Sequence, residues 1–209
     1  MTITEFNVYG NKKGYVVDFN QEDISKALKF SKDIIHGDNQ FNRLLPNDVK
    51  DKSESNKYRI QRTYVGKLGE IAFNKLLMSK GIYTDISDMF KIFEGQSSVD
   101  KFDFITLDKK TVDIKTGFLS NHKRLIVNLE QFNNIKKDYY VGVKLIGDKE
   151  CFDKKLFDEN SVRRAQIFGY AEYGYLDTKC DRKNFGEGNS VYTDYVSLME
   201  IDKLIKMFK

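Results

Sequence analysis

The sequence predicts an α/β protein with a mixed central β-sheet flanked by helices and a small hairpin–helix lobe at the N-terminus. Two long segments repeat apolar residues at helical spacing, and several short segments are rich in the aromatic and β-branched residues typical of strands. The two kinds of segment are interleaved along the chain, which favours helices layered on a sheet. We expect the N-terminal lobe to cover residues 1–57 and the core to cover residues 58–209.

The composition is consistent with one domain and a sizeable core, since 40% of the 209 residues are hydrophobic. The net charge of +4 permits nucleic-acid binding but does not require it. The two cysteines, Cys151 and Cys180, have no metal-binding or redox spacing. The N-terminus has no basic region followed by an apolar run, and no apolar segment approaches membrane-spanning length. We therefore expect a soluble, cytoplasmic protein with no membrane partner.

The first 57 residues predict, in order, a hairpin of residues 3–9 and 15–19, a helix that Gly37 ends, and a polar connection over residues 38–57. Asn20 is placed to cap this helix, because Asp23 follows it at the capping-box position. His36 lies in the last turn, where a charge partner of the helix terminus is expected rather than a metal ligand.

Residues 58–80 form the strongest predicted helix, and Gly81 follows it. Its apolar stripe consists of Tyr64, Val65, Leu68, Ile71 and Ala72. A second stripe consists of Thr63, Gly66, Lys67, Glu70, Asn74 and Leu77. Gly66 and Gly69 would each cost about 1 kcal/mol relative to alanine inside a helix, so another group should approach the backbone closely there. A strand of the sheet and a phosphate are both compatible with this pattern.

The second half of the chain alternates further strands with loops. The predicted strands cover residues 82–86, 102–107, 111–116, 125–129, 139–146, 163–173 and 192–199. Helical turns are expected near residues 87–99 and over residues 131–137, with loops over residues 148–160 and 178–190 and a closing helix over residues 201–208.

The functional prediction is centred on residues 101–117, which read as two antiparallel strands joined by the loop 108–110. With that loop, Asp103 lies opposite Lys115 and Ile105 lies opposite Asp113. Because side chains alternate along a strand, Asp103, Asp113 and Lys115 then share one face. The opposite face carries Phe102, Phe104, Val112 and Ile114. A two-residue loop would shift the register by one and separate the two acids.

Two acids and a lysine on one face are suited to a particular chemistry. Two carboxylates held close together repel each other unless a cation lies between them. With a backbone carbonyl they form a hard oxygen site suited to Mg²⁺. A lysine beside that site can orient a water, lower its pKa or neutralise charge that develops on a phosphate. The pattern therefore favours metal-assisted phosphodiester hydrolysis, and the alternative is a surface hairpin with scattered charges.

Three segments occur in a characteristic order: GKLGEIAFNKLL with Glu70, then FDFITLDKKTVDIKT with Asp103 and Asp113-Ile114-Lys115, and later QIFGYAEYG. Over residues 58–173 the chain resembles the PD-(D/E)xK nuclease superfamily, which includes many type II restriction endonucleases and archaeal Holliday-junction resolvases. Phe102 replaces the proline of the motif, and the second acid is an aspartate rather than the commoner glutamate.

The resemblance implies a restriction-endonuclease-like core and a catalytic set of Glu70, Asp103, Asp113 and Lys115. It implies that Asp103, Asp113 and the Ile114 carbonyl bind Mg²⁺. Glu70 would reach the metal directly, reach it through water, or hold Lys115. Lys115 would position or activate the attacking water and stabilise the charged transition state. The expected reaction is hydrolysis of a DNA phosphodiester that leaves a 5′-phosphate.

The candidates for contacts with DNA are Lys67, Asn74, Lys123 and Arg124, with Arg62, Arg163 and Arg164 as further candidates. A solvated surface charge is the alternative for each charged residue among them. His122 is not expected to bind a metal, although it could assist near the scissile phosphate.

The leading functional hypothesis is a Mg²⁺-dependent endonuclease of double-stranded DNA, a sequence-specific type II restriction enzyme. One active site cuts one strand, so cleavage of both strands predicts a homodimer. The first alternative is a structure-specific nuclease of the same superfamily, acting on junctions or in recombination and repair. The second is a nucleic-acid-binding module that does not cleave.

Overall fold

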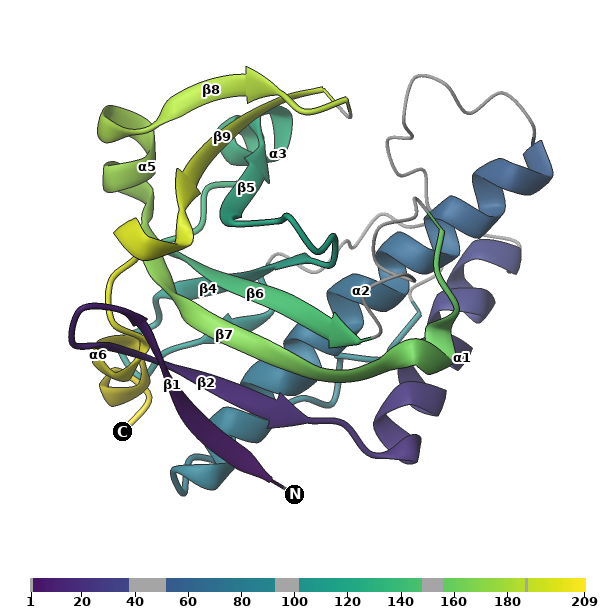
Figure 1. Ribbon diagram of the computed structural model, residues 1–209, viewed down its shortest axis with the longest axis horizontal. Coiled ribbons are helices and arrows are strands. Elements are labelled where there is room, and N and C mark those ends of the chain that lie inside the picture. Colours follow the sequence, from purple (N-terminus) through teal and green to yellow (C-terminus); the bar gives the residue numbers. More distant parts are fainter. Residues whose placement is uncertain (1, 38–51, 93–101, 148–155, 187) are drawn as a thin grey trace.

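The structure is a computed structural model and describes residues 2–37, 52–92, 102–147, 156–186 and 188–209 (Figure 1). Within these residues the chain forms a six-stranded mixed sheet, a smaller three-stranded antiparallel sheet, and helices. The predicted mixed α/β class is thus confirmed. Some predicted segments lie partly outside the described residues: residues 38–51 of the connection predicted over 38–57, residues 93–99 of the helical turn predicted near 87–99, and residues 148–155, with Cys151, of the loop predicted over 148–160.

The central sheet has the strand order β1-β2-β7-β6-β4-β3. In that order its strands are β1 (Ile3–Tyr9), β2 (Lys12–Asp18), β7 (Val162–Glu172), β6 (Tyr139–Gly147), β4 (Thr111–Gly117) and β3 (Phe104–Ile105). β4 and β6 run parallel, and the other neighbours are antiparallel. The small sheet has the order β5 (Arg124–Asn128), β9 (Asn189–Asp194) and β8 (Asp181–Asn184).

The α-helices are α1 (Gln21–His36), α2 (Lys52–Ser79), α3 (Leu129–Asn134), α5 (Tyr173–Lys179) and α6 (Ile201–Lys206). Short 3₁₀ turns cover Glu159–Ser161 and Tyr195–Ser197. In the part of the chain that is described, no helix is both long enough and apolar enough to cross a membrane.

The N-terminal hairpin and helix form as predicted, and the capping box is present. The Asp23 N–H donates to Asn20 Oδ1 over 2.9 Å, and the Asn20 N–H donates to Asp23 Oδ2 over 2.8 Å. β2 pairs with β7, and α1 packs against α2, so residues 3–36 share the central sheet and its core with the rest of the chain. The predicted boundary between residues 57 and 58 falls inside α2, which begins six residues earlier than expected.

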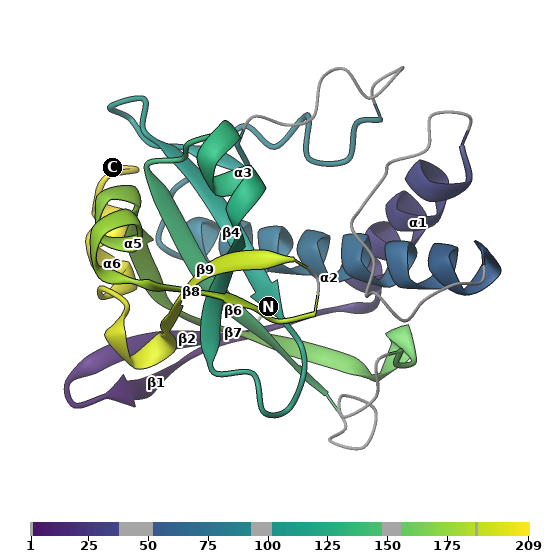
Figure 2. The ribbon, with the colours of Figure 1, turned by 90° about the horizontal axis from the view of Figure 1, so that it is seen from above.

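α2 crosses one face of the central sheet and contacts β2, β4, β6 and β7 (Figure 2). Its predicted apolar stripe is buried, including Tyr64 and Leu68, which are fully inaccessible. A Cβ on Gly69 would overlap Thr116 Oγ1 on β4, so a strand is the group that approaches the helix backbone at this glycine. The helix ends just before Gly81, whose φ of 75° is a conformation that suits glycine.

Alternation along the strands divides the core into two hydrophobic clusters, one on each face of the central sheet. On β6, Val141, Val143 and Leu145 pack into the cluster that contains α2, while Tyr140 packs into the other. The second cluster joins the central sheet to the small sheet, α3 and α5. The small sheet and α2 are therefore on opposite faces of the central sheet.

Several predicted elements differ from the structure. Residues 82–86 do not form a strand, although Ile82 is buried in the core. The segment predicted as a loop over residues 178–190 contains β8, and α5 directly follows β7. The predicted strand 192–199 is β9 shifted towards the N-terminus, followed by the turn Tyr195–Ser197.

Candidate active site

The hairpin that carries the acids has a register two residues away from the predicted one. Phe104 lies opposite Val112 and Ile105 lies opposite Thr111, so the predictions that Ile105 faces Asp113 and that Asp103 faces Lys115 are wrong. The cause is a longer loop, over residues 106–110, that Thr106 closes. The Thr106 N–H donates to the Lys110 carbonyl over 2.9 Å, and Thr106 Oγ1 accepts from the Lys110 N–H over 3.0 Å. A shift of two residues preserves the alternation of faces, so Phe104, Val112 and Ile114 are buried in the core as predicted, whereas Phe102 precedes β3 and is 36% exposed.

Asp103 lies immediately before β3 and pairs with β4 through both its backbone and its side chain. Its N–H donates to the Val112 carbonyl over 3.0 Å, and its Oδ2 accepts from the Ile114 N–H over 2.6 Å. The Asp103 carboxylate thus accepts the hydrogen bond from β4 that a backbone carbonyl would accept if β3 were longer. The N–H and C=O of one strand residue point to the same edge, so the Ile114 carbonyl also faces the edge where Asp103 lies.

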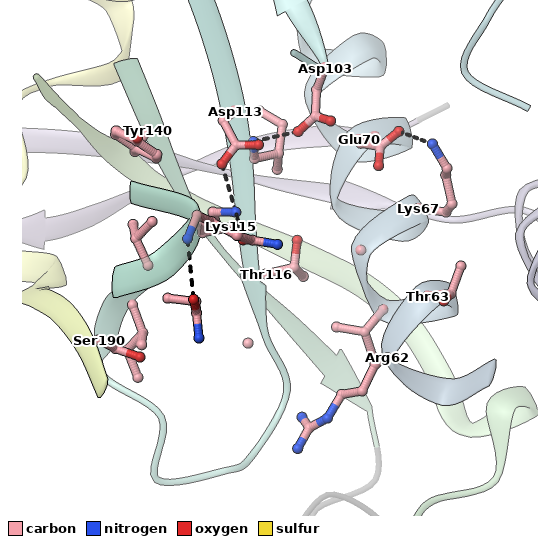
Figure 3. Close-up of a pocket in the computed structure, with 18 of the residues that line it drawn as sticks. Arg62, Thr63, Lys67, Glu70, Asp103, Asp113, Lys115, Thr116, Tyr140 and Ser190 are labelled. Carbon is pink, nitrogen blue, oxygen red and sulfur yellow. Dashed lines mark hydrogen bonds and ion pairs between the residues drawn. The ribbon is translucent and has the colours of Figure 1, made fainter. Parts of the chain in front are cut away.

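Glu70 approaches the same place from α2, and two lysine–acid pairs face each other across the site (Figure 3). Lys67 Nζ lies 2.6 Å from Glu70 Oε2, and these side chains are only 9% and 13% exposed. Lys115 Nζ lies 2.7 Å from Asp113 Oδ2. Glu70 reaches the hairpin because α2 passes close to β4 beside it, at Gly69.

The acids influence one another electrostatically. Burial raises the pKa of the Asp103 carboxyl well above its ordinary value, and the charges of Glu70 and Asp113 raise it further. The Ile114 N–H and the Lys115 ammonium oppose this rise in pKa. Asp103 therefore binds a proton readily, and a cation placed between these acids would relieve the same repulsion.

The donor chemistry at this site suits Mg²⁺. Among the described residues, no group of three or more His, Cys, Asp and Glu side chains is arranged to hold a metal ion. Mg²⁺ usually keeps several waters, however, and binds only one or two carboxylates. The carboxylates of Asp103 and Asp113 and the carbonyl of Ile114 are hard oxygen donors on one strand edge and one sheet face. Burial, together with the charges of Glu70 and Asp113, raises the pKa of Asp103, and a bound cation would offset these effects, so the residues present fit the ion.

The acids line a cavity of about 750 Å³. One side consists of α2 and α1, including Thr63, Gly66 and Phe30, and the other consists of β5, α3 and the end of the β8–β9 hairpin. Between them, β4 contributes every residue from Asp113 to Gly117. The cavity therefore joins the acid–lysine cluster to the small sheet.

The predicted DNA contacts divide into two groups. Lys67 and Arg124 line the cavity, as does the further candidate Arg62. Asn74 and Lys123 are not part of its lining. Asn74 is a buried residue of α2, and its Oδ1 accepts from Thr84 Oγ1 over 3.3 Å, whereas Lys123 is exposed.

The other two arginine candidates lie on β7. Arg164 is 3.6 Å from Asp18, and Arg163 donates to the carbonyl of Asn160. Neither residue lines the cavity.

Gln131 extends the predicted set, and His122, which was expected at most to assist near the scissile phosphate, also lines the cavity. Gln131, at the start of the helical turn that the sequence predicted, accepts from Lys115 Nζ over 3.4 Å. Its helical position was visible in the sequence, but its contact was not. His122 packs over Gly117, where a Cβ would overlap the imidazole ring. Burial lowers the pKa of His122 to about 4, so this ring is neutral at physiological pH.

Comparison of the chain with known protein families, with curated proteins and with solved structures finds no match.

Proposed function

We propose that this protein is a Mg²⁺-dependent DNA endonuclease, a sequence-specific enzyme of the type II restriction class that acts on double-stranded DNA. The observation that carries the proposal is that Glu70, Asp103, Asp113 and Lys115 line one cavity and that the other three influence Asp103 electrostatically. Along the chain they come from a helix, from the residue just before a strand and from that strand's antiparallel neighbour, which is the order that the nuclease superfamily uses.

In this proposal Asp103, Asp113 and the Ile114 carbonyl hold the metal, with Glu70 beside them. When bound, Mg²⁺ would act as a Lewis acid and lower the pKa of a bound water. Lys115 Nζ, now paired with Asp113 and near Gln131, can donate to the attacking water or to a non-bridging phosphate oxygen. Water attacks the phosphorus and the bond to the 3′-oxygen breaks, which leaves a 5′-phosphate and a 3′-hydroxyl.

The shape and charge of the cavity support a nucleic-acid substrate. Its volume is in the range of small-ligand sites, so it can take one phosphodiester with its neighbouring sugars while the rest of a duplex stays outside. Arg62, Lys67 and Arg124 add positive charge to its lining. Cleavage of both strands would require two such sites, which favours a homodimer.

Cleavage of natural DNA tests this proposal. Unmethylated plasmid and phage DNA, and a branched junction, are incubated with the protein in Mg²⁺ or in EDTA. The test variants are Asp113→Asn and Lys115→Met. The matched control is Glu5→Gln, because Glu5 pairs with Lys13 at the same 2.7 Å but lies outside the cavity.

Discrete Mg²⁺-dependent bands from wild type and Glu5→Gln, absent with both test variants, are the expected result. Cleavage confined to the junction would replace the restriction hypothesis by a structure-specific nuclease. If none of the three DNAs is cut in Mg²⁺, the enzyme hypothesis is refuted, and DNA binding without cleavage would then indicate a binding module.

A further inference from the structure

The small sheet presents two different faces. Leu125 and Val127 of β5 and Val191 of β9 are buried in the second hydrophobic cluster. The residues between them face the other way, and Arg124, Ile126, Asn128 and Ser190 line the cavity. The register places Arg124 opposite Asp194 and Ile126 opposite Tyr192. This face therefore lies in the same cavity as the acid–lysine cluster, and Figure 1 shows the small sheet set apart from α2 across the molecule.

Arg124 is held in place on this face by contacts with three residues. Its Nε donates to Asp194 Oδ1 over 3.0 Å, directly across from the neighbouring strand. The guanidinium carbon lies 5.1 Å from the centre of the Tyr192 ring and 5.9 Å from that of Phe185. The side chain is nevertheless 43% exposed. A guanidinium fixed by a carboxylate and aromatic rings is preorganised, so binding a ligand costs it little further side-chain entropy.

The geometry of this arginine selects among possible ligands. A guanidinium has five N–H donors, and the bond to Asp194 uses the one on Nε. The terminal nitrogens can form a two-pronged contact with a pair of acceptors, either guanine O6 and N7 or two phosphate oxygens. The carboxylate of Asp194 repels an anionic phosphate more strongly than it repels the uncharged edge of a base. The pairing therefore favours guanine.

We infer that the cavity-facing side of the small sheet reads the base edges of duplex DNA and that Arg124 contacts a guanine in the recognition sequence. The inference rests on the proposed function insofar as DNA occupies the cavity. It adds that sequence specificity comes from β5 and the β8–β9 hairpin, whereas the chemistry comes from α2, β3 and β4.

Binding selection tests the inference separately from cleavage. A randomised duplex library is selected by the wild-type protein with Ca²⁺ in place of Mg²⁺, and the variants are Arg124→Gln and Arg124→Lys. The matched control is Arg182→Gln. Arg182 lies on β8 of the same sheet, is 46% exposed and pairs with Asp177 at 3.2 Å, but does not line the cavity.

Wild type and Arg182→Gln should select a G·C pair at one position. Arg124→Gln should lose that preference by roughly 10- to 100-fold and keep the others, as expected for one two-pronged base contact. Arg124→Lys should also lose the preference, because an ammonium is not a planar fork. Thermal melting of each variant establishes that it is folded. If Arg124→Gln does not fold, the test uses Arg124→Lys, which keeps the positive charge.

A uniform loss of affinity for all sequences, with weaker salt dependence, would identify a phosphate contact and overturn the inference. No effect of Arg124→Gln, no sequence preference or no DNA binding by wild type would overturn it as well. Selection of a guanine through Arg124 without cleavage in Mg²⁺ would uphold the inference and refute the nuclease. Cleavage without sequence preference would uphold the nuclease and refute the inference.

Discussion

Replacing Gly69 by alanine tests whether close contact between α2 and β4 builds the site. A methyl group at this position would overlap Thr116 Oγ1 and would lie 3.1 Å from Thr116 Cβ and 3.2 Å from Ile114 Cγ2. Either the helix or the strand must therefore move. Since Glu70 and Lys115 are the neighbours of these residues in sequence, such a shift also separates groups of the candidate active site.

The magnitude follows from two opposing effects. Overpacking a tight contact typically costs about 1–3 kcal/mol. Alanine gains about 1 kcal/mol over glycine inside a helix. We expect Gly69→Ala to lower the free energy of unfolding by a net amount of about 1 kcal/mol, which lowers the Tm by roughly 2–4 °C in a protein of this size.

Thr116→Ala is the matched partner for a double-mutant cycle. Among the described residues Thr116 Oγ1 has no hydrogen-bond partner, so its removal breaks no hydrogen bond with them. In that background Gly69→Ala should be neutral or stabilising, with a coupling energy of about 1–2 kcal/mol from urea unfolding curves. If Gly69→Ala stabilises the wild-type protein by about 1 kcal/mol and shows no coupling to Thr116, the close approach is not present.

Three further predictions concern charges in the cavity. The folded protein holds a proton on Asp103, whereas the unfolded chain releases it near the ordinary pKa of 3.8. As pH rises from that value through the raised pKa of the folded state, wild type should therefore lose stability relative to Asp103→Asn. Urea unfolding across pH measures this loss, and a constant difference in stability between the two proteins would contradict it. His122 has the opposite effect, because folding lowers its pKa from 6.5 to about 4. As pH falls through that interval, wild type should lose up to about 3 kcal/mol of unfolding free energy relative to His122→Gln. A difference in stability between the two proteins that does not change with pH would contradict a neutral imidazole at this position. Lys67→Met should destabilise the protein by about 1–3 kcal/mol because Glu70 loses its nearby cation. Adding Glu70→Gln to this variant should recover part of the lost stability. If thermal unfolding shows instead that the losses of the two substitutions simply add, the pairing is contradicted.

The local features of the fold were predictable because they depend on neighbouring residues. The capping box of Asn20 and Asp23 and the apolar stripe around Tyr64 and Leu68 follow from short-range spacing. The placement of Asp113 and Lys115 on one face follows from alternation, which a register error of two does not change. These are properties that a sequence pattern specifies directly.

The register of the β3–β4 hairpin and the formation of the small sheet depend on contacts that the order of apolar and polar residues does not specify. The alternation of side chains specifies which residues share a face, but registers that differ by two residues satisfy it equally well. The loop length, which selects among them, depended on the hydrogen bonds of Thr106. β5 pairs with β9, whose residues are about 70 positions later in the chain, so the contacts of Arg124 with Asp194 and Tyr192 could not be read from either segment alone. Asn74 shared a predicted stripe with Glu70 but lies outside the cavity lining, because it is one turn further along α2.

The most direct test of the central claim is the cutting of supercoiled plasmid followed by ligation. The account predicts that wild type cuts the plasmid only with Mg²⁺, that DNA ligase reseals the products without prior phosphorylation because they carry 5′-phosphates, and that Asp113→Asn does not cut. It also predicts a loss on the order of 100-fold or more in rate for Lys115→Met, because this variant lacks the ammonium that we propose donates to the attacking water or to the phosphate. Cutting by Asp113→Asn at the wild-type rate, or no Mg²⁺-dependent cutting by wild type, would contradict the account.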